Sequence, residues 1–131
     1  MRPHVPKSKR QSGRLSVFKG REAKLNKAIF HILALKGPQP VYALLSEIRK
    51  QRGFTDTRYE VLRRRLEALE KPDYLMKVGI VKTHVGSYAP VYQLTPRAEL
   101  ASTLSQINLD RFIKDAGYAQ IIQMLETLKP T

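Results

Sequence analysis

Apolar side chains recur every three or four residues in two neighbouring segments near the start of the chain, which predicts two α-helices. The first helix is expected over residues 21–35. The second begins near Val41 and ends before Gly53. Gly37-Pro38 separates them, because glycine suits the position after a last helical turn and proline cannot continue a helix. The inward stripes are Leu25, Ala28, Ile29, Ile32 and Leu33 in the first helix, and Val41, Leu44, Leu45 and Ile48 in the second.

A third helix is predicted from about Thr57 to the residues before Lys71-Pro72. Thr57 and Glu60 have the spacing of a capping box, in which each side chain satisfies a backbone N–H of the first turn. Its inward stripe is Tyr59, Leu62, Leu66 and Leu69. At 100° per residue Arg64 then points outward, flanked by the small or short side chains Thr57, Val61 and Ala68, with Arg58, Arg63 and Arg65 on the shoulders. A narrow basic face of this kind can enter the groove of a duplex.

A β-hairpin is predicted after the third helix. Met76, Val78 and Ile80 alternate with Lys77 and Gly79, as in a half-buried strand, and residues 91–94 form the return strand. Thr95-Pro96 then begins a helix that continues to about residue 105, with threonine as the cap and proline in the first turn. A last helix is expected from Leu109 to Leu128, capped by Asn108 and broken near Gly117.

The order of these elements predicts a mainly α-helical fold with a small β-hairpin. Three helices followed by a hairpin form a winged helix-turn-helix, in which two helices brace a third that enters the major groove. The remaining helices follow at the C-terminus. The expected organisation is a flexible basic arm over residues 1–20, a winged-helix DNA-binding domain over residues 21–100 and a helical dimerisation element over residues 101–131.

Three sequence phrases resemble winged-helix transcriptional regulators of the PadR and MarR kind. Residues 32–45 (ILALKGPQPVYALL) resemble the first two helices and their Gly-Pro turn, and residues 59–70 (YEVLRRRLEALE) resemble the recognition helix. Residues 92–100 (YQLTPRAEL) resemble the exit from the wing, with Ala98 where the family usually has glycine. The resemblance covers roughly residues 22–100. It implies duplex DNA binding and dimerisation through a C-terminal helix.

The distribution of charge supports a polyanionic partner. The 131 residues carry 24 Lys and Arg against 11 Asp and Glu, a formal charge of +13. Residues 1–24 contribute +7 and residues 25–100 contribute +6, whereas residues 101–131 are neutral. A basic arm and a basic body suit phosphate contacts, with a solubilising tail as the alternative for the arm. The predicted wing tip lacks arginine and lysine, so the arm is the stronger candidate for the minor groove.

The residues expected to contact nucleic acid come from the arm, the third helix and the hairpin. The arginines of the third helix could instead form a solvated face paired with glutamates three or four residues away. The expected set is Lys7, Lys9, Arg10, Arg14, Lys19, Thr57, Arg58, Val61, Arg63, Arg64, Arg65, Lys82, His84, Ser87 and Tyr88.

The last helix is too apolar for a free surface, so we expect its apolar stripe to pack against the same stripe of a second copy of the chain, in an isologous two-fold contact. The alternative is that it folds back on its own domain. The residues assigned to this homodimer contact are Leu109, Phe112, Ile113, Ile121, Leu125 and Leu128.

Several functions are not expected. The chain has no cysteine, its three histidines are scattered, and its acids do not cluster, so no metal site or cofactor is predicted. It holds no P-loop, dinucleotide-binding, zinc-protease or nucleophile-elbow motif, so we do not expect an enzyme. No apolar run approaches the length of a membrane span, and no signal peptide is found, so a cytoplasmic, nucleoid-associated protein is expected.

The leading hypothesis is therefore a homodimeric protein that binds double-stranded DNA, as a transcriptional regulator or an architectural factor. Two alternatives stay open: an RNA- or ribosome-associated winged-helix protein, and an adaptor that binds other proteins through the hairpin and last helix. Binding to duplex DNA, structured RNA and single strands would separate them.

Overall fold

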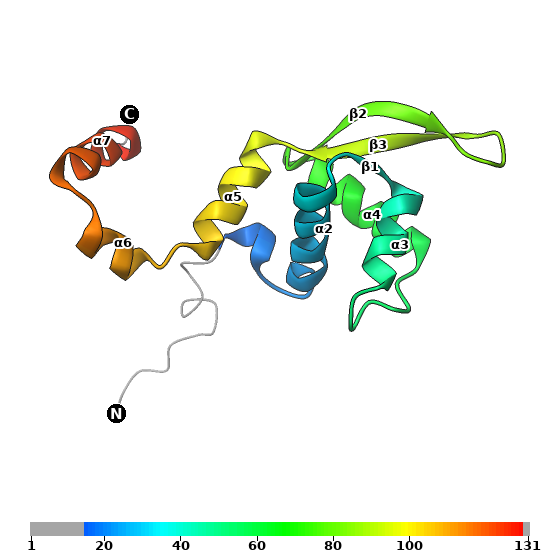
Figure 1. Ribbon diagram of the computed structural model, residues 1–131, viewed down its shortest axis with the longest axis horizontal. Coiled ribbons are helices and arrows are strands. Elements are labelled where there is room, and N and C mark those ends of the chain that lie inside the picture. The colour runs from blue at the N-terminus through cyan, green and yellow to red at the C-terminus, as the bar shows by residue number, and fades with distance from the viewer. Residues whose placement is uncertain (1–14, 130–131) are drawn as a thin grey trace.

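A computed structural model describes residues 15–129, which form six α-helices, one 3₁₀ turn and a three-stranded antiparallel sheet (Figure 1). The mainly helical fold with a small β-hairpin predicted from the sequence is confirmed at this level. The elements are η1 (Ser16–Phe18), α2 (Ala23–Lys36), β1 (Gln39–Pro40), α3 (Val41–Arg49), α4 (Tyr59–Glu70), β2 (Leu75–Lys82), β3 (Tyr88–Leu94), α5 (Pro96–Gln106), α6 (Leu109–Asp115) and α7 (Tyr118–Leu128).

Helices α2, α3 and α4 pack on one another and on the sheet, and their apolar stripes form the core. The end of α2 is set by Gly37, whose φ of 80° is costly for other residues and whose N–H donates to the Leu33 carbonyl. All of the predicted inward residues of α2 and α3 are buried. The fully enclosed side chains of this core are Ile29, Leu44, Ile48, Leu62, Leu66 and Leu75.

The sheet has the strand order β1-β3-β2, so the long strand β2 lies at one edge. Its pairing with β3 shifts between Lys77 and Gly79, where Val78 is an extra residue in a β-bulge. The predicted half-buried alternation of Met76, Val78 and Ile80 is wrong, because all three side chains are exposed. The bulge breaks the period of two, and the outer part of the hairpin extends beyond the helices (Figure 1).

The N-terminal part of the described chain belongs to the core. Val17 and Phe18 in η1 are buried, Phe18 being 4% exposed, and the Asn26 side-chain amide donates to the Val17 carbonyl at 2.8 Å. The Phe18 ring meets Phe30 edge-on, with centroids 5.5 Å apart. The predicted flexible arm therefore does not extend to residue 20: residues 15–20 are packed on α2. A three-residue turn is too short to show a period in the sequence.

Replacing Phe18 with alanine should lower the free energy of unfolding by about 3–5 kcal/mol, because it removes a buried ring and leaves a cavity against Phe30. Urea denaturation measures this loss. Leu35→Ala is the matched control: Leu35 is exposed on α2, and its truncation should change stability by less than about 0.5 kcal/mol. Equal losses for the two variants would show that η1 is not held in the core.

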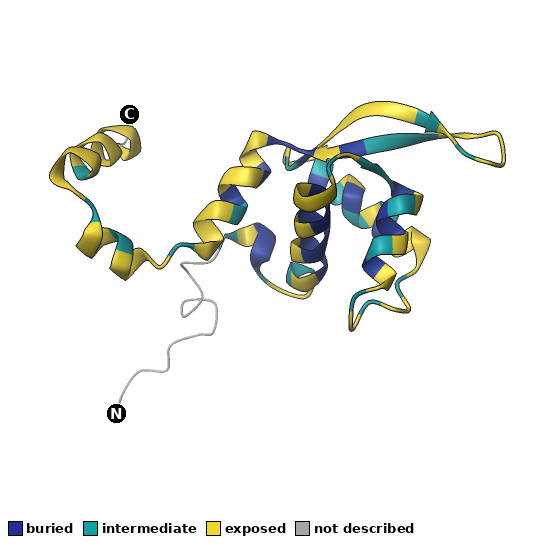
Figure 2. Cartoon of the chain, in the orientation of Figure 1, coloured by how far each residue is buried: buried dark blue, intermediate teal, exposed yellow. Residues whose placement is uncertain are grey.

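The C-terminal helices begin and end as the sequence predicts. The Thr95 hydroxyl accepts from the Ala98 N–H at 3.2 Å at the start of α5, and the Asn108 side chain accepts from the Arg111 N–H at 3.1 Å at the start of α6. The predicted break at Gly117 separates α6 from α7. Helix α5 contributes buried Ala98 and Ala101 to the core, whereas α6 and α7 have no buried residue and lie away from the body (Figure 2).

Candidate nucleic-acid interface

Helix α4 is anchored by three leucines and exposes the opposite face. Leu62, Leu66 and Leu69 are buried, as predicted, and Val61 and Arg64 are exposed. Tyr59 was predicted in the same buried stripe but is 45% exposed. It stands in the first turn of the helix, beyond the part of α4 that the core covers.

The capping box predicted at the start of α4 does not form. The Thr57 hydroxyl donates to the Phe54 carbonyl at 2.8 Å, within the loop between α3 and α4, and no side chain caps the helix. The Thr57 carbonyl accepts from Arg49 Nε at 2.9 Å, so the end of α3 fixes the loop. Both the N–H and the hydroxyl of Thr57 donate to the Phe54 carbonyl, so the hydroxyl is not available to cap the helix. Helix α4 therefore begins at Tyr59 without a side-chain cap.

Two of the four arginines assigned to this helix are paired with acids. Arg63 lies between Glu60, 2.9 Å away, and Glu67, on the same face of α4. The hydrogen bond from Arg63 lowers the pKa of Glu60, and the same bond raises the pKa of Arg63. Arg65 approaches Glu22 at 3.6 Å, and its side chain is only 21% exposed. Arg65 therefore connects α4 to the start of α2, and Arg63 has much of its charge balanced locally.

The other two arginines face solvent. Arg58 and Arg64 are exposed and form no ion pair with any of the chain's 11 acids, all of which lie within residues 15–129. The alternative of a glutamate-paired face thus applies to Arg63, whereas Arg64 forms no ion pair, although its charge also contributes to the lowered pKa of Glu60. The unbalanced charge of α4 lies on its first half, near Val61.

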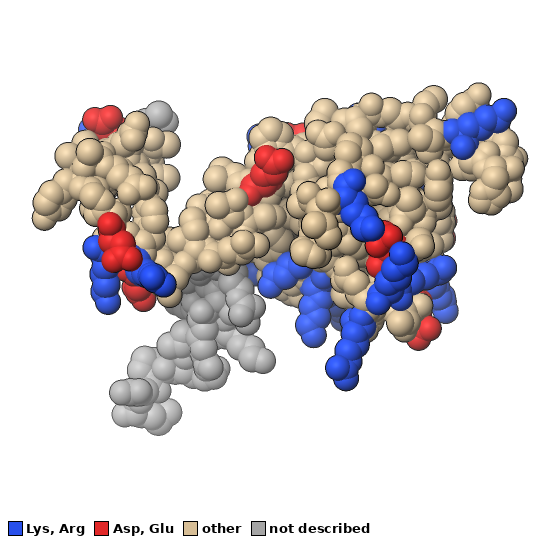
Figure 3. Space-filling view, in the orientation of Figure 1, with Lys and Arg blue, Asp and Glu red and all other residues tan. Residues whose placement is uncertain are grey.

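An open groove of about 700 Å³ adjoins this part of α4. It lies between the start of α2 and the loop before α4, and Thr57, Arg58 and Val61 line it together with Arg21 and Lys24. Arg21 and Lys24 were missing from the expected contact residues, because periodicity cannot show that the first turn of α2 lies beside the first turn of α4. In Figure 3 basic side chains gather at this end of the helical body.

The hairpin residues of the expected set lie at the outer end of β2 and β3. Lys82 pairs with Tyr88 across the strands, and Tyr88 is 67% exposed. The turn is held by the Thr83 N–H, which donates to the Ser87 carbonyl at 2.7 Å, and by Gly86 with a φ of 89°. His84 and Ser87 are exposed in it. These four side chains form a second cluster, separate from the α4 groove.

Of the five expected contact residues in the arm, only Lys19 lies in the described chain, next to buried Phe18. The other four, Lys7, Lys9, Arg10 and Arg14, lie outside the described residues. Within residues 15–129 no group of three His, Asp or Glu side chains could hold a metal ion. No helix in that range is long and apolar enough to cross a membrane.

Comparisons with protein-family models, with curated proteins and with solved structures return no match to this chain. The assignment of a function therefore depends on the arrangement of its own residues.

Proposed function

We propose that the protein binds double-stranded DNA as a winged helix-turn-helix, with α4 in the major groove. Three helices followed by a hairpin have the order of that fold, and the packing of α3 against both α2 and α4 is compatible with it. On this proposal α4 is the recognition helix and the β2–β3 hairpin is the wing.

The observation that carries the proposal is the exposed, narrow and unbalanced basic face of α4. Val61 and Arg64 lie one turn apart on the exposed face of α4, Arg58 stands just before its first turn, and Val61 keeps the face slim enough for a groove about 12 Å wide. Arg64 can donate two hydrogen bonds to the edge of a guanine, and Val61 can contact a thymine methyl group.

The basic residues around the α4 groove would hold the phosphates beside it. Arg21, Lys24 and Arg58 line one open groove at the end of the helical body, together with two acids, Asp56 and Glu22, of which Glu22 is paired with Arg65. Phosphate contacts of this kind fix the register of a recognition helix without reading sequence. The wing cluster and the arm, residues 1–14, would extend the contact to neighbouring phosphates or the minor groove.

We also propose that the protein acts as a homodimer. The large apolar residues of α6 and α7 are exposed or half-buried in the single chain, including Leu109, Ile113, Leu125 and Leu128. Such a surface is rare on a monomer and indicates a protein partner. A second copy would place two recognition helices on one side of a duplex.

The direct test measures fluorescence anisotropy of labelled duplex DNA, duplex RNA and single-stranded DNA with the full chain at physiological salt. We expect the duplex DNA to bind most tightly. Preference for structured RNA would support the ribosome-associated alternative, and binding to none of them would favour the adaptor. Footprinting on genomic fragments then separates the two DNA roles, because discrete protected sites indicate a regulator and uniform coverage an architectural factor.

Arg64→Ala should weaken binding to a preferred duplex by about 1–3 kcal/mol, or roughly 5- to 150-fold, and much less to other sequences. Lys114→Ala is the charge-matched control, since Lys114 is exposed on α6, away from α4, and its loss should lower the affinity for every duplex slightly and alike. Competition anisotropy measures both variants, with thermal melting to confirm folding. If Arg64→Ala binds every duplex like the unmodified protein, α4 is not the reader.

A further inference from the structure

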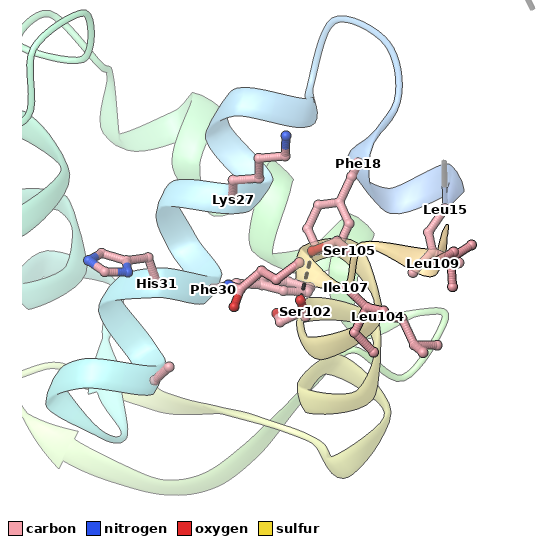
Figure 4. A pocket seen from close by; sticks show the side chains of 12 residues that line it. Leu15, Phe18, Lys27, Phe30, His31, Ser102, Leu104, Ser105, Ile107 and Leu109 are labelled. Carbon is pink, nitrogen blue, oxygen red and sulfur yellow. Dashed lines mark hydrogen bonds between the residues drawn. The ribbon is translucent and has the colours of Figure 1, made fainter. Parts of the chain in front are cut away.

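A groove of about 820 Å³ opens between η1, α2, α5 and the start of α6 (Figure 4). It is distinct from the groove beside α4. Leu104 and Leu109 are largely exposed at its edge, whereas Phe18 and Phe30 at its floor belong to the core. Its lining is mixed, with the apolar residues Leu15, Phe18, Phe30, Ala34, Leu104, Ile107 and Leu109 beside the polar or charged residues Lys27, His31, Ser102, Ser105 and Gln106. Leu104 and Leu109 leave apolar surface at the mouth of the groove, which an apolar helix could cover.

Helix α7 has the surface that such a groove needs. At 100° per residue its apolar side chains form one stripe, and none of them is buried. The stripe is Tyr118, Ile121, Ile122, Met124, Leu125 and Leu128. The only charged residue of α7 is Glu126, at the flank of this stripe, and the only Lys or Arg in the groove lining is Lys27. The apolar stripe of α7 thus matches the apolar part of the groove, and Glu126 and Lys27 give the two surfaces one charge of opposite sign each.

The helix lengths argue against occupation by α7 of the same chain. At 1.5 Å per residue, α6 is about 10 Å long and α7 about 16 Å. Ile107 and Leu109, at the start of α6, belong to the groove lining. If the chain reversed at Ala116-Gly117, most of α7 would lie along α6, and only its last turn would reach the groove. A second copy has no such restriction.

The N-terminal residues are a poor alternative occupant. Residues 1–14 contain only Met1 and Val5 as large apolar side chains, beside five basic residues. They cannot supply an apolar stripe long enough for the groove. Helix α7 has such a stripe, because large apolar side chains recur on one face in each of its turns.

We propose that α7 of one chain docks in the α2–α5 groove of a second copy, and that the exchange is reciprocal. The inference rests on the two-copy assembly proposed above and specifies its contact. The stripe of α7 would meet a groove in the partner, and not the same stripe of the partner. Both recognition helices would then be held at a distance set by the α6–α7 segment.

The test is site-directed crosslinking, for which the chain is well suited because it contains no cysteine. Ala34 is an exposed residue that lines the groove, and Ile122 is exposed on α7. Ala34→Cys and Ile122→Cys proteins are mixed at micromolar concentration and treated with a short bis-maleimide. We expect a covalent dimer of twice the 15.0 kDa chain mass in the mixture, and little from either protein alone.

A matched control replaces Ala34→Cys by Ser46→Cys, an exposed residue of α3 that does not line the groove. Its mixture with Ile122→Cys should give at least tenfold less covalent dimer. The double variant Ala34→Cys/Ile122→Cys distinguishes the direction of docking: a crosslinked dimer supports exchange, and a crosslinked monomer overturns it by placing α7 on its own chain.

Other outcomes also overturn the proposal. Crosslinking of Ile122→Cys only to itself would show that α7 pairs with α7, and the absence of any specific product would show that the groove is not occupied by α7. If the unmodified protein sediments as a monomer, both the proposed docking and the proposed two-copy assembly are wrong. The anisotropy experiments report duplex binding separately, so a failure of the DNA proposal is distinguishable from a failure of the docking.

Discussion

Removal of residues 1–14 should lower the salt dependence of duplex binding by about 4 units of slope in a plot of log affinity against log salt concentration. The segment carries five positive charges, Arg2, Lys7, Lys9, Arg10 and Arg14, and no acid. Each phosphate that a basic side chain neutralises releases counterions and contributes about 0.9 to the slope on duplex DNA. The affinity at low salt should fall for all duplex sequences alike, because phosphate contacts carry no sequence information.

The position of the cut matters for this experiment. A truncation at residue 20 would also remove buried Val17 and Phe18 and destabilise the fold, whereas a cut after Arg14 leaves η1 intact. A full-length variant with the same five residues replaced by glutamine controls for chain length and should lose the same slope. Titrations at several salt concentrations measure it. A slope unchanged in both variants would show that the arm is a solubilising tail.

The helical core could be predicted because its pattern is local and repeated. Leu62, Leu66 and Leu69 recur at helical spacing, and this spacing places them on one apolar face of α4, which the structure buries. The starts of α5 and α6 could also be predicted, because the side chains of Thr95 and Asn108 accept hydrogen bonds from backbone N–H groups only three residues away. In each case the interaction that decides the structure lies within a few residues.

The predictions that failed depend on where neighbouring elements stop. Tyr59 continues the inward stripe of α4, but the core does not extend to its turn. Ile80 has the alternation of a half-buried strand, yet it lies beyond the bulge at Val78, on the outer part of the hairpin. Phe18 joins the core from a turn too short to have a period. A period shows which face is apolar, and it does not show how far the partner surface reaches.

The sequence predicts that arginines lie on the outer face of α4, but it does not predict which of them are paired with acids. The sequence places Arg63 and Arg64 side by side, with glutamates at helical spacing that could pair with either face. The geometry assigns Glu60 and Glu67 to Arg63, leaving Arg64 exposed. Arg21 and Lys24 join the groove of α4 through tertiary packing between segments more than thirty residues apart, which no local pattern reveals.

Replacement of Ile121 and Leu125 by glutamate should convert the proposed dimer to a monomer and weaken binding to a two-half-site duplex by about 100-fold or more. Both residues lie in the apolar stripe of α7, so each new carboxylate would lose its hydration in the contact without gaining a partner. A dimer gains affinity because binding of one recognition helix raises the effective concentration of the second, a benefit of about 10²–10⁴-fold. Binding to a single half-site should change much less.

Sedimentation velocity and anisotropy on duplexes with one or two half-sites, spaced by about 10 base pairs or a multiple, measure these effects. Gln123→Glu/Thr127→Glu is the matched control, since it adds the same charge to α7, at the same spacing of four residues, on the side opposite the stripe. That control should remain a dimer and keep its preference for two half-sites. Because α6 and α7 have no buried residue in the single chain, neither variant removes a core contact. Loss of assembly in the stripe variant alone would therefore identify this stripe as the subunit contact, and a dimer that survives both variants would place the contact elsewhere.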